Sequence, residues 1–306
     1  MRFLASYASK GRWQALTVVA VSALLTPLLM PLSLLSGAAV ALITLKVGVM
    51  QGLQLAGLSA LAVGLVGMLM PAPVNGPALA LTLAMLVWLP VWGLSSNLGR
   101  TADQGRVALL ATLFGAMVVV AFHLSVPNPG QWWQEFAQGY FAQVTAQLSG
   151  EERAQFEANI AQTASVMTGI SALGLSLSLM LSVLIGRWWQ AMLVNPGGFG
   201  TEFRALRVGR KPTLLILLVS FAAMFSGGEG FGQDMLMVMM LPFMLQAVAV
   251  VHSMVNSAGA SKGWLVGLYL LLVFAGPLAL LLAVAGALDN WFDFRAYATP
   301  KGGEGE

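Results

Sequence analysis

Residues 195–211, NPGGFGTEFRALRVGRK, form a charged segment between two long apolar runs, and so mark a boundary between two elements of the fold. The segment carries one acidic residue and four of the chain's 15 lysines and arginines. Its adjacent glycines resemble a phosphate-binding loop. Such a loop, however, needs a lysine followed by serine or threonine, and a dinucleotide fingerprint needs a preceding strand. Both features are missing, so we interpret the segment as a basic loop between two membrane-crossing helices.

The composition around this loop is typical of a membrane protein. Of the 306 residues, 58% are apolar and 9% are charged, and the mean hydropathy is +0.81. Soluble domains carry about 25% charged residues. Cysteine is absent, which excludes disulfides, thiolate catalysis and cysteine metal sites. The predicted fold class is all-α: a polytopic transmembrane helical bundle that forms a single membrane domain over 1–306.

Nine apolar runs approach the length of about 20 residues that a helix needs to cross a bilayer. They cover roughly 14–31, 33–48, 50–70, 76–95, 106–125, 162–187, 213–227, 233–256 and 263–287. Pro27 and Pro31 mark the turn between the first two runs. The run 213–227 is short enough to be re-entrant, so we predict eight or nine spans.

Lysine and arginine collect in the cytoplasmic loops of membrane proteins. With a cytoplasmic N-terminus, 12 of the 15 basic residues lie inside, and only Arg153, Arg295 and Lys301 lie outside. This orientation gives a basic cytoplasmic loop at 188–212 and a periplasmic insertion at 126–161. The predicted cytoplasmic anchor, or else docking surface for a cytoplasmic protein partner, consists of Arg204, Arg207, Arg210 and Lys211.

The periplasmic insertion has the pattern of an amphipathic helix. Trp133, Phe136 and Tyr140 recur at helical spacing, while glutamines fill the other face. Ser149, three residues before Glu152, predicts the start of a second helix. We interpret this helical pair either as a hairpin packed on the bundle or as a lid over an outer cavity.

Polar groups inside membrane helices are candidate functional residues, because placing them in lipid is costly. In the run 233–256, four of them lie within an arc of about 120°: Gln246, His252, Ser253 and Asn256. Pro242, one turn earlier, is expected to free a backbone carbonyl there, as in the broken helices of transporters. We predict either that the four residues line the site of a small-molecule substrate or that they only hydrogen-bond neighbouring helices.

Two further groups are candidates. His123 and Asp234 each lie near the outer end of a predicted span. A predicted outer-face cluster, either an anchor or a gate with ligand contacts, consists of Asp289, Trp291, Asp293 and Arg295.

No enzyme signature is present. The two histidines lie on different runs, and the motifs HExxH and GxSxG are missing. Basic residues do not interleave with aromatic residues as they do on a nucleic-acid surface. We expect no catalysis, no cofactor, no metal and no nucleic acid. The expected partners are the lipid bilayer and either a small solute or a cytoplasmic protein.

Three segments resemble the YybS-like family of bacterial inner-membrane proteins, a domain of unknown function: NPGGFGTEFRALRVGRKP (195–212), LQAVAVVHSMV (245–255) and LDNWFDFRAY (288–297). That family is distantly similar to the S components of energy-coupling-factor vitamin transporters. The resemblance implies a bacterial inner-membrane location. S components have six spans and an alanine-xxx-alanine motif in the first helix, a spacing that Ala15, Ala20 and Ala23 do not keep.

These observations predict an integral membrane protein of the transporter type that binds or translocates a small solute. The alternative is a non-transporting scaffold that recruits a cytoplasmic partner through the basic loop 195–211.

Overall fold

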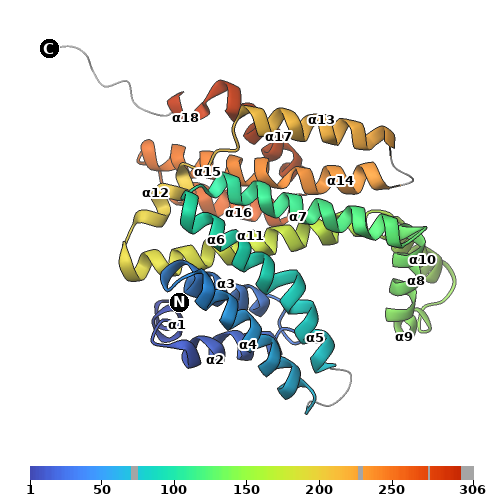
Figure 1. The fold of residues 1–306 in the computed structure, drawn as a ribbon. Helices are drawn as coiled ribbons and strands as arrows, with labels where there is room; N and C mark the ends of the chain where they lie inside the picture. The colour runs from blue at the N-terminus through green and yellow to red at the C-terminus, as the bar shows by residue number, and fades with distance from the viewer. Residues whose placement is uncertain (70–74, 227–229, 275, 298–306) are drawn as a thin grey trace.

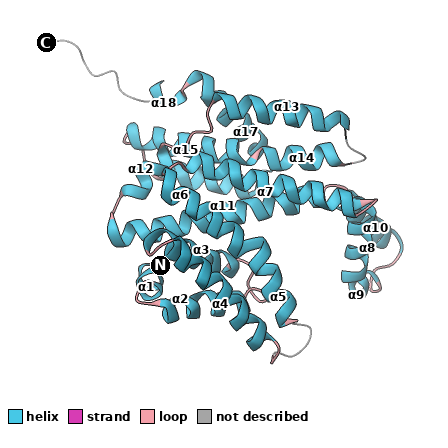
Figure 2. Cartoon of the chain, in the orientation of Figure 1, coloured by secondary structure: helices cyan, strands magenta, loops and turns pink. Residues whose placement is uncertain are grey.

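The structure is helical throughout its described part. The computed structural model describes residues 1–69, 75–226, 230–274 and 276–297, and these ranges contain α-helices, one π-helical segment and no strand (Figure 2). The predicted all-α fold class is confirmed.

The chain forms its helices in the following order. The first half contains α1 (Arg2–Ala8), α2 (Arg12–Leu24), α3 (Leu32–Lys46), α4 (Val49–Gly67), α5 (Gly76–Leu83), the π segment η1 (Ala84–Trp88), α6 (Leu89–Thr101) and α7 (Gln104–Ser125). The middle contains α8 (Pro129–Tyr140), α9 (Ala142–Thr145), α10 (Gly150–Ala164), α11 (Met167–Val194) and α12 (Gly198–Arg204). The last part contains α13 (Arg210–Ser226), α14 (Phe231–Met239), α15 (Leu241–Ser257), α16 (Gly263–Phe274), α17 (Gly276–Phe292) and α18 (Phe294–Tyr297).

Five helices are long and apolar enough to cross a membrane: Val49–Gly67, Gly76–Thr101, Gln104–Ser125, Met167–Val194 and Phe231–Ser257. Three other predicted spans form shorter helices, namely α2 with 13 residues, α3 with 15 and α13 with 17. At 1.5 Å per residue these three reach only about 20 to 26 Å. The hydrocarbon core of a bilayer is about 30 Å thick, so they are shorter than a full crossing.

The predicted span 263–287 is wrong as a single crossing. The structure divides it into α16, which ends at Phe274, and α17, which begins at Gly276. Pro277 is the second residue of α17. Proline is tolerated in the first turn of a helix, but within a continuous helix its ring clashes with the carbonyl four residues earlier and its missing N–H removes a hydrogen bond. The chain therefore starts a new helix instead of continuing the first.

The break changes the side of the bundle on which the C-terminal cluster lies. Asp293 forms an ion pair with Arg207, and an Arg295 guanidinium nitrogen donates a hydrogen bond to the Leu206 carbonyl at 2.6 Å. The cluster of Asp289, Trp291, Asp293 and Arg295 had been predicted on the opposite membrane face from the basic loop. That placement is wrong, because it assumed one crossing where the chain forms two helices.

We call the end of the bundle that contains residues 195–209 the basic end, and the end that contains α8, α9 and α10 the aromatic end. Figure 1 shows the two at opposite ends of the long helices α7 and α11. Of the 14 lysines and arginines in the described residues, only Arg153 belongs to the aromatic end. Lys301 lies outside the described residues. The charge asymmetry between the two ends is thus greater than the sequence alone predicted.

The predicted basic loop 188–212 is shorter than expected. Helix α11 continues to Val194, α12 occupies residues 198–204, and α13 begins at Arg210. The arginines of the predicted anchor are therefore held on or beside helices, which limits their movement.

Residues 126–161 form the helices of the aromatic end. The Asn128 side chain caps α8 by accepting a hydrogen bond from the Gln131 N–H at 3.1 Å. Helix α10 begins at Gly150 as predicted, although the Ser149 side chain makes no capping hydrogen bond. Helices α8 and α10 pack against each other, and α10 stops at Ala164 before α11 begins.

Glycines allow the closest contacts between helices. A Cβ atom at Gly186 of α11 would lie 2.5 Å from the Ala41 Cβ of α3, and one at Gly286 of α17 would lie 1.9 Å from the Phe243 carbonyl of α15. Gly174, also on α11, has no such neighbour within 4 Å. The helices are therefore closely packed where α3 meets α11 and where α15 meets α17.

Candidate functional site

A buried pair of ionisable side chains joins helix ends at the aromatic end. His123 lies in the last turn of α7 and Asp234 in the first turn of α14. The His123 Nε2 atom is 2.8 Å from the Asp234 Oδ2 atom, and the exposed fractions of the two side chains are 12% and 2%. An acidic group at a helix start and a basic group at a helix end both complement the helix dipoles.

The carboxylate also binds the start of a third helix. Its Oδ1 atom accepts a hydrogen bond from the Gly169 N–H, in the first turn of α11, at 2.8 Å. A Cβ atom at Gly169 would lie 2.7 Å from the Asp234 Cα, so only glycine allows this approach. Asp234 thus ties together α7, α11 and α14, all of which belong to candidate membrane spans.

The neighbouring residue of α11 holds helix α8. The Trp133 indole N–H donates a hydrogen bond to the Thr168 hydroxyl at 2.9 Å. The Trp133 ring also packs between those of Phe122, at a centroid distance of 5.8 Å, and Phe136, at 5.9 Å. In the first turn of α11, Gly169 therefore contacts Asp234 of the buried ion pair, and Thr168 contacts Trp133 of α8.

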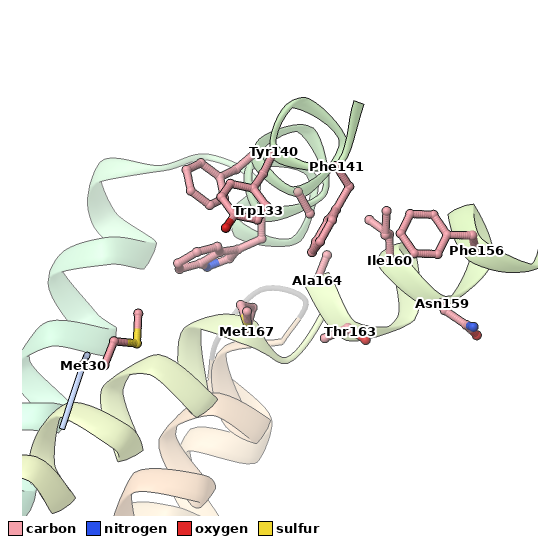
Figure 3. Close-up of a pocket in the computed structure, with 12 residues that line it drawn as sticks. Met30, Trp133, Tyr140, Phe141, Phe156, Asn159, Ile160, Thr163, Ala164 and Met167 are labelled. Atoms are coloured by element: carbon pink, nitrogen blue, oxygen red, sulfur yellow. The ribbon is translucent and has the colours of Figure 1, made fainter. Parts of the chain in front are cut away.

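Beneath α8 and α10 lies a cavity of about 550 Å³. Its lining includes five aromatic rings, those of Trp133, Phe136, Tyr140, Phe141 and Phe156. Figure 3 shows Trp133, Tyr140 and Phe141 on one side of this space, and Ile160, Ala164 and Met167 facing them from α10 and α11. The volume lies within the range of about 300–1,000 Å³ that is typical of small-molecule sites.

None of the residues that line this cavity is charged. The polar side chains in the lining are few, and Asn159 and Thr163 supply two of them from α10. Such a lining suits an apolar or aromatic ligand that needs only one or two hydrogen bonds.

A second buried polar network lies at the basic end. The Gln246 side-chain amide donates to the Asp289 Oδ2 atom at 2.8 Å, and its carbonyl accepts from the Val208 N–H at 2.8 Å. The Asp289 Oδ1 atom accepts from the Phe294 N–H at 3.0 Å. Gln246 and Asp289 are 0% and 1% exposed, so this network joins α15, α17 and the segment before α13 inside the protein.

Arg295 completes the network at the basic end. Its guanidinium lies 3.6 Å from the Asp289 Oδ2 atom and hydrogen-bonds the Leu206 carbonyl. Burial lowers the pKa of this guanidinium below its ordinary value, and the Asp289 carboxylate offsets part of that decrease. An arginine nevertheless keeps its charge in proteins, so the network holds one opposite-charge pair.

The four predicted substrate-lining residues do not converge on one site. Gln246 belongs to the network of the basic end, whereas His252 lies 2.8 Å from the Tyr269 hydroxyl and packs edge-on against Phe203. Ser253 is partly buried, and Asn256 is exposed in the last turn of α15. A cavity of about 530 Å³ beside α15 is lined by apolar neighbours of the arc, such as Val250.

The four predicted docking residues have different environments. Arg207 pairs with Asp293, and the Arg210 Nε atom donates to the Asn290 carbonyl at 2.9 Å. Arg204 is partly buried, with the Thr201 hydroxyl 3.5 Å from its guanidinium. Lys211 is exposed. Intramolecular contacts therefore engage three of the four side chains.

Sequence reasoning identified His123 and Asp234 singly and missed their contact. Both residues lie near the outer ends of predicted spans, and this shared position was the only sequence feature that indicated a contact between them. The Asn290 side-chain oxygen accepts a hydrogen bond from the Gly209 N–H at 2.8 Å. This contact and that of Gly169 with Asp234 had no sequence signal, because each depends on which helices are neighbours.

Comparison with known proteins gives no relative: no protein-family model, no curated protein and no solved structure matches this chain.

Proposed function

We propose that the chain is an integral membrane protein of the transporter type, which binds a small uncharged solute in the cavity beneath α8 and α10. The observation that carries this proposal is the linkage of that cavity to the buried His123–Asp234 pair through the consecutive residues Thr168 and Gly169.

The buried pair gives the cavity a means of communicating with the bundle. Ionisable groups inside a membrane bundle are costly and are functional candidates by default. The contacts of Asp234 with His123 and with the Gly169 N–H join α7, α11 and α14. Because Trp133 is anchored on the same turn of α11, we expect solute binding at its ring to be coupled to the contacts among these helices.

Ligand-induced thermal stabilisation of the purified protein tests the binding site. A panel of uncharged aromatic solutes, beginning with indole, is added to the protein in detergent. We expect a stabilising solute to lose its effect on Trp133→Ala, which removes a ring from the cavity lining, and to keep it on Trp132→Ala. Trp132 is the matched control, since it lies on the same helix but does not line the cavity. Equal responses of both variants would contradict the proposed site.

Uptake into proteoliposomes tests translocation separately from binding. Asp234→Asn keeps an acceptor for the Gly169 N–H but removes the carboxylate charge. We expect this variant to retain solute-induced stabilisation and to lose most uptake. Unchanged uptake by Asp234→Asn would remove the buried pair from the mechanism.

The alternative function is a scaffold that binds a cytoplasmic protein through the basic end. It is favoured by the exposure of Arg207, Arg210 and Lys211 on a segment whose backbone is fixed by Gln246 and Asn290. Charge reversal at Arg204 and Lys211 leaves the contacts with Asp293 and Asn290 intact. A scaffold loses its partner in pull-downs with this variant, whereas a transporter keeps its solute.

We also propose, as the resemblance implies, membership of the YybS-like family and a bacterial inner-membrane location. The support is spatial, because the three segments that carry the resemblance meet at the basic end: Gln246 accepts a hydrogen bond from the Val208 N–H and donates one to Asp289.

A further inference from the structure

A cleft at the basic end, distinct from the cavity beneath α8 and α10, combines a polar end with an apolar end. It has a volume of about 880 Å³ and lies between the start of α2, the end of α3 and the first half of α4. Its polar lining residues are Ser9, Arg12, Gln51 and Gln54.

One face of α4 runs along the cleft. Gln51, Gln54, Leu58 and Leu61 all line the cleft and recur at intervals of three or four residues, so they share a helix face. The face changes from polar to apolar along the helix. At 1.5 Å per residue, Gln51 and Leu61 are about 15 Å apart along the helix axis. This is half of the hydrocarbon thickness of about 30 Å, or the depth of one leaflet.

Arg12 gives the polar end a positive charge without a partner carboxylate. The first 102 residues contain five basic residues and no acidic residue. Within the described residues, no carboxylate lies within ion-pair distance of Arg12. Its guanidinium lies 5.4 Å from the centre of the Trp13 ring, which is 62% exposed. Tryptophan prefers the headgroup level of a membrane, so Trp13 places Arg12 at that level.

The helices that form the cleft add to this positive potential. Helix α2 begins at Arg12 after Gly11, and α4 begins at Val49 after Gly48; neither start has a side-chain cap. The N-terminal ends of both helices, which carry partial positive charge, therefore lie at the polar end of the cleft.

We propose that this cleft binds one anionic glycerophospholipid from the leaflet at the basic end. The phosphate is bound by Arg12, with the amides of Gln51 and Gln54 as hydrogen-bonding groups, and one acyl chain lies along Leu58 and Leu61. A soluble anion fits the charge of the site but leaves its apolar half empty. A neutral lipid fits the apolar half but leaves Arg12 without a counter-charge.

The test measures lipid binding to the full-length, delipidated protein in detergent. Phosphatidylglycerol is titrated in, and bound lipid is counted by native mass spectrometry while thermal unfolding is followed in parallel. We expect one tightly held phosphatidylglycerol and a rise in Tm. Phosphatidylcholine and inorganic phosphate at the same concentrations should produce neither effect. Stabilisation by inorganic phosphate alone would identify the site as one for a soluble anion and would overturn the proposal, as would equal occupancy by phosphatidylcholine.

Two variants locate the binding. Arg12→Gln should weaken phosphatidylglycerol binding by about fivefold or more, since a basic residue contributes about that factor to attraction by anionic lipid. Arg106→Gln is the matched control, because Arg106 is exposed and does not line the cleft. Leu58→Trp fills the apolar half and should lower occupancy with Arg12 intact. Equal losses from Arg12→Gln and Arg106→Gln, or full occupancy in both cleft variants, would contradict the proposed site.

Discussion

Two carboxylates are buried against the α14–α15 helix pair, Asp234 in the first turn of α14 and Asp289 beside Gln246 of α15, but they have different partners. At the aromatic end, Asp234 is held by an imidazole and one backbone N–H of a neighbouring helix. At the basic end, Asp289 is held by the Gln246 amide, a backbone N–H and the Arg295 guanidinium. Their exposed fractions are nearly equal, at 2% and 1%, so burial alone does not distinguish them.

The difference lies in the hydrogen-bonding chemistry of the partners. Amide, backbone N–H and guanidinium groups are fixed donors, so the network around Asp289 has one hydrogen-bonding arrangement and acts as a structural junction. An imidazole nitrogen donates or accepts according to its tautomer, so the contact with Asp234 is less strictly specified. This contact adjoins the aromatic-lined cavity through the consecutive residues Thr168 and Gly169.

The largest expected effect is that of Asp289→Ala. It leaves the buried Gln246 amide and Arg295 guanidinium without this acceptor, and breaking a buried charge pair costs about 3–5 kcal/mol. Thermal unfolding in detergent measures the loss. Asp293→Asn is the control; its pair with Arg207 is nearly half exposed, and asparagine tolerates the left-handed backbone of this residue (φ 46°), so we expect a loss of about 0–1 kcal/mol. Similar losses for both variants would mean that Asp289 is no junction.

A smaller effect is expected for His123→Ala at the aromatic end. Removing a hydrogen bond to a charged group costs about 1.5–3 kcal/mol, and Gly169 still donates to Asp234 in the variant. The chain's other histidine supplies the comparison, because the His252 contact with Tyr269 is exposed. Chemical denaturation should show a clearly smaller loss for His252→Ala. If His252→Ala proved the more damaging, the buried pair would not join the three helices.

The smallest expected effect is the difference in stability between alanine substitutions at two glycines of α11. In Gly169→Ala the new methyl group meets the Asp234 backbone, which cannot move aside, so we expect a loss of about 1–3 kcal/mol. Gly174→Ala has free space and should gain up to about 1 kcal/mol, because alanine favours a helix over glycine. The Tm values of the two variants measure this difference. Tolerance of alanine at Gly169 would show that α11 and α14 are less closely packed than described.

The sequence predicted the features that depend on local pattern. Apolar runs and charged boundaries predicted the helical class and the long helices Val49–Gly67, Gly76–Thr101, Gln104–Ser125 and Met167–Val194, and Ser149 predicted the start of α10. The break at Gly276-Pro277 was missed, because hydropathy counts apolar side chains and ignores the missing backbone donor of proline. The misplacement of Asp289 and Arg295 followed from that single omission.

The sequence showed the polar arc on α15, but it did not show which residues the side chains of the arc contact. A helical arc gives the direction of each side chain around the axis and not what lies opposite. Gln246 faces the Val208 N–H and Asp289, whereas His252, nearly two turns later, faces Tyr269 and Phe203. The pairing of His123 with Asp234 likewise required the knowledge that α7 and α14 are adjacent.

Cysteine accessibility in membrane vesicles tests the central claim most directly, because the chain contains no cysteine and each substitution introduces a single thiol. Three exposed positions suffice: Thr201 in α12, Ala296 in α18 and Ala154 in α10. A membrane-impermeant maleimide should label Thr201→Cys and Ala296→Cys from the same side, and Ala154→Cys from the other. Labelling of positions 201 and 296 from opposite sides would contradict the shared basic end, and labelling of all three from both sides of a sealed vesicle would contradict a membrane-spanning bundle.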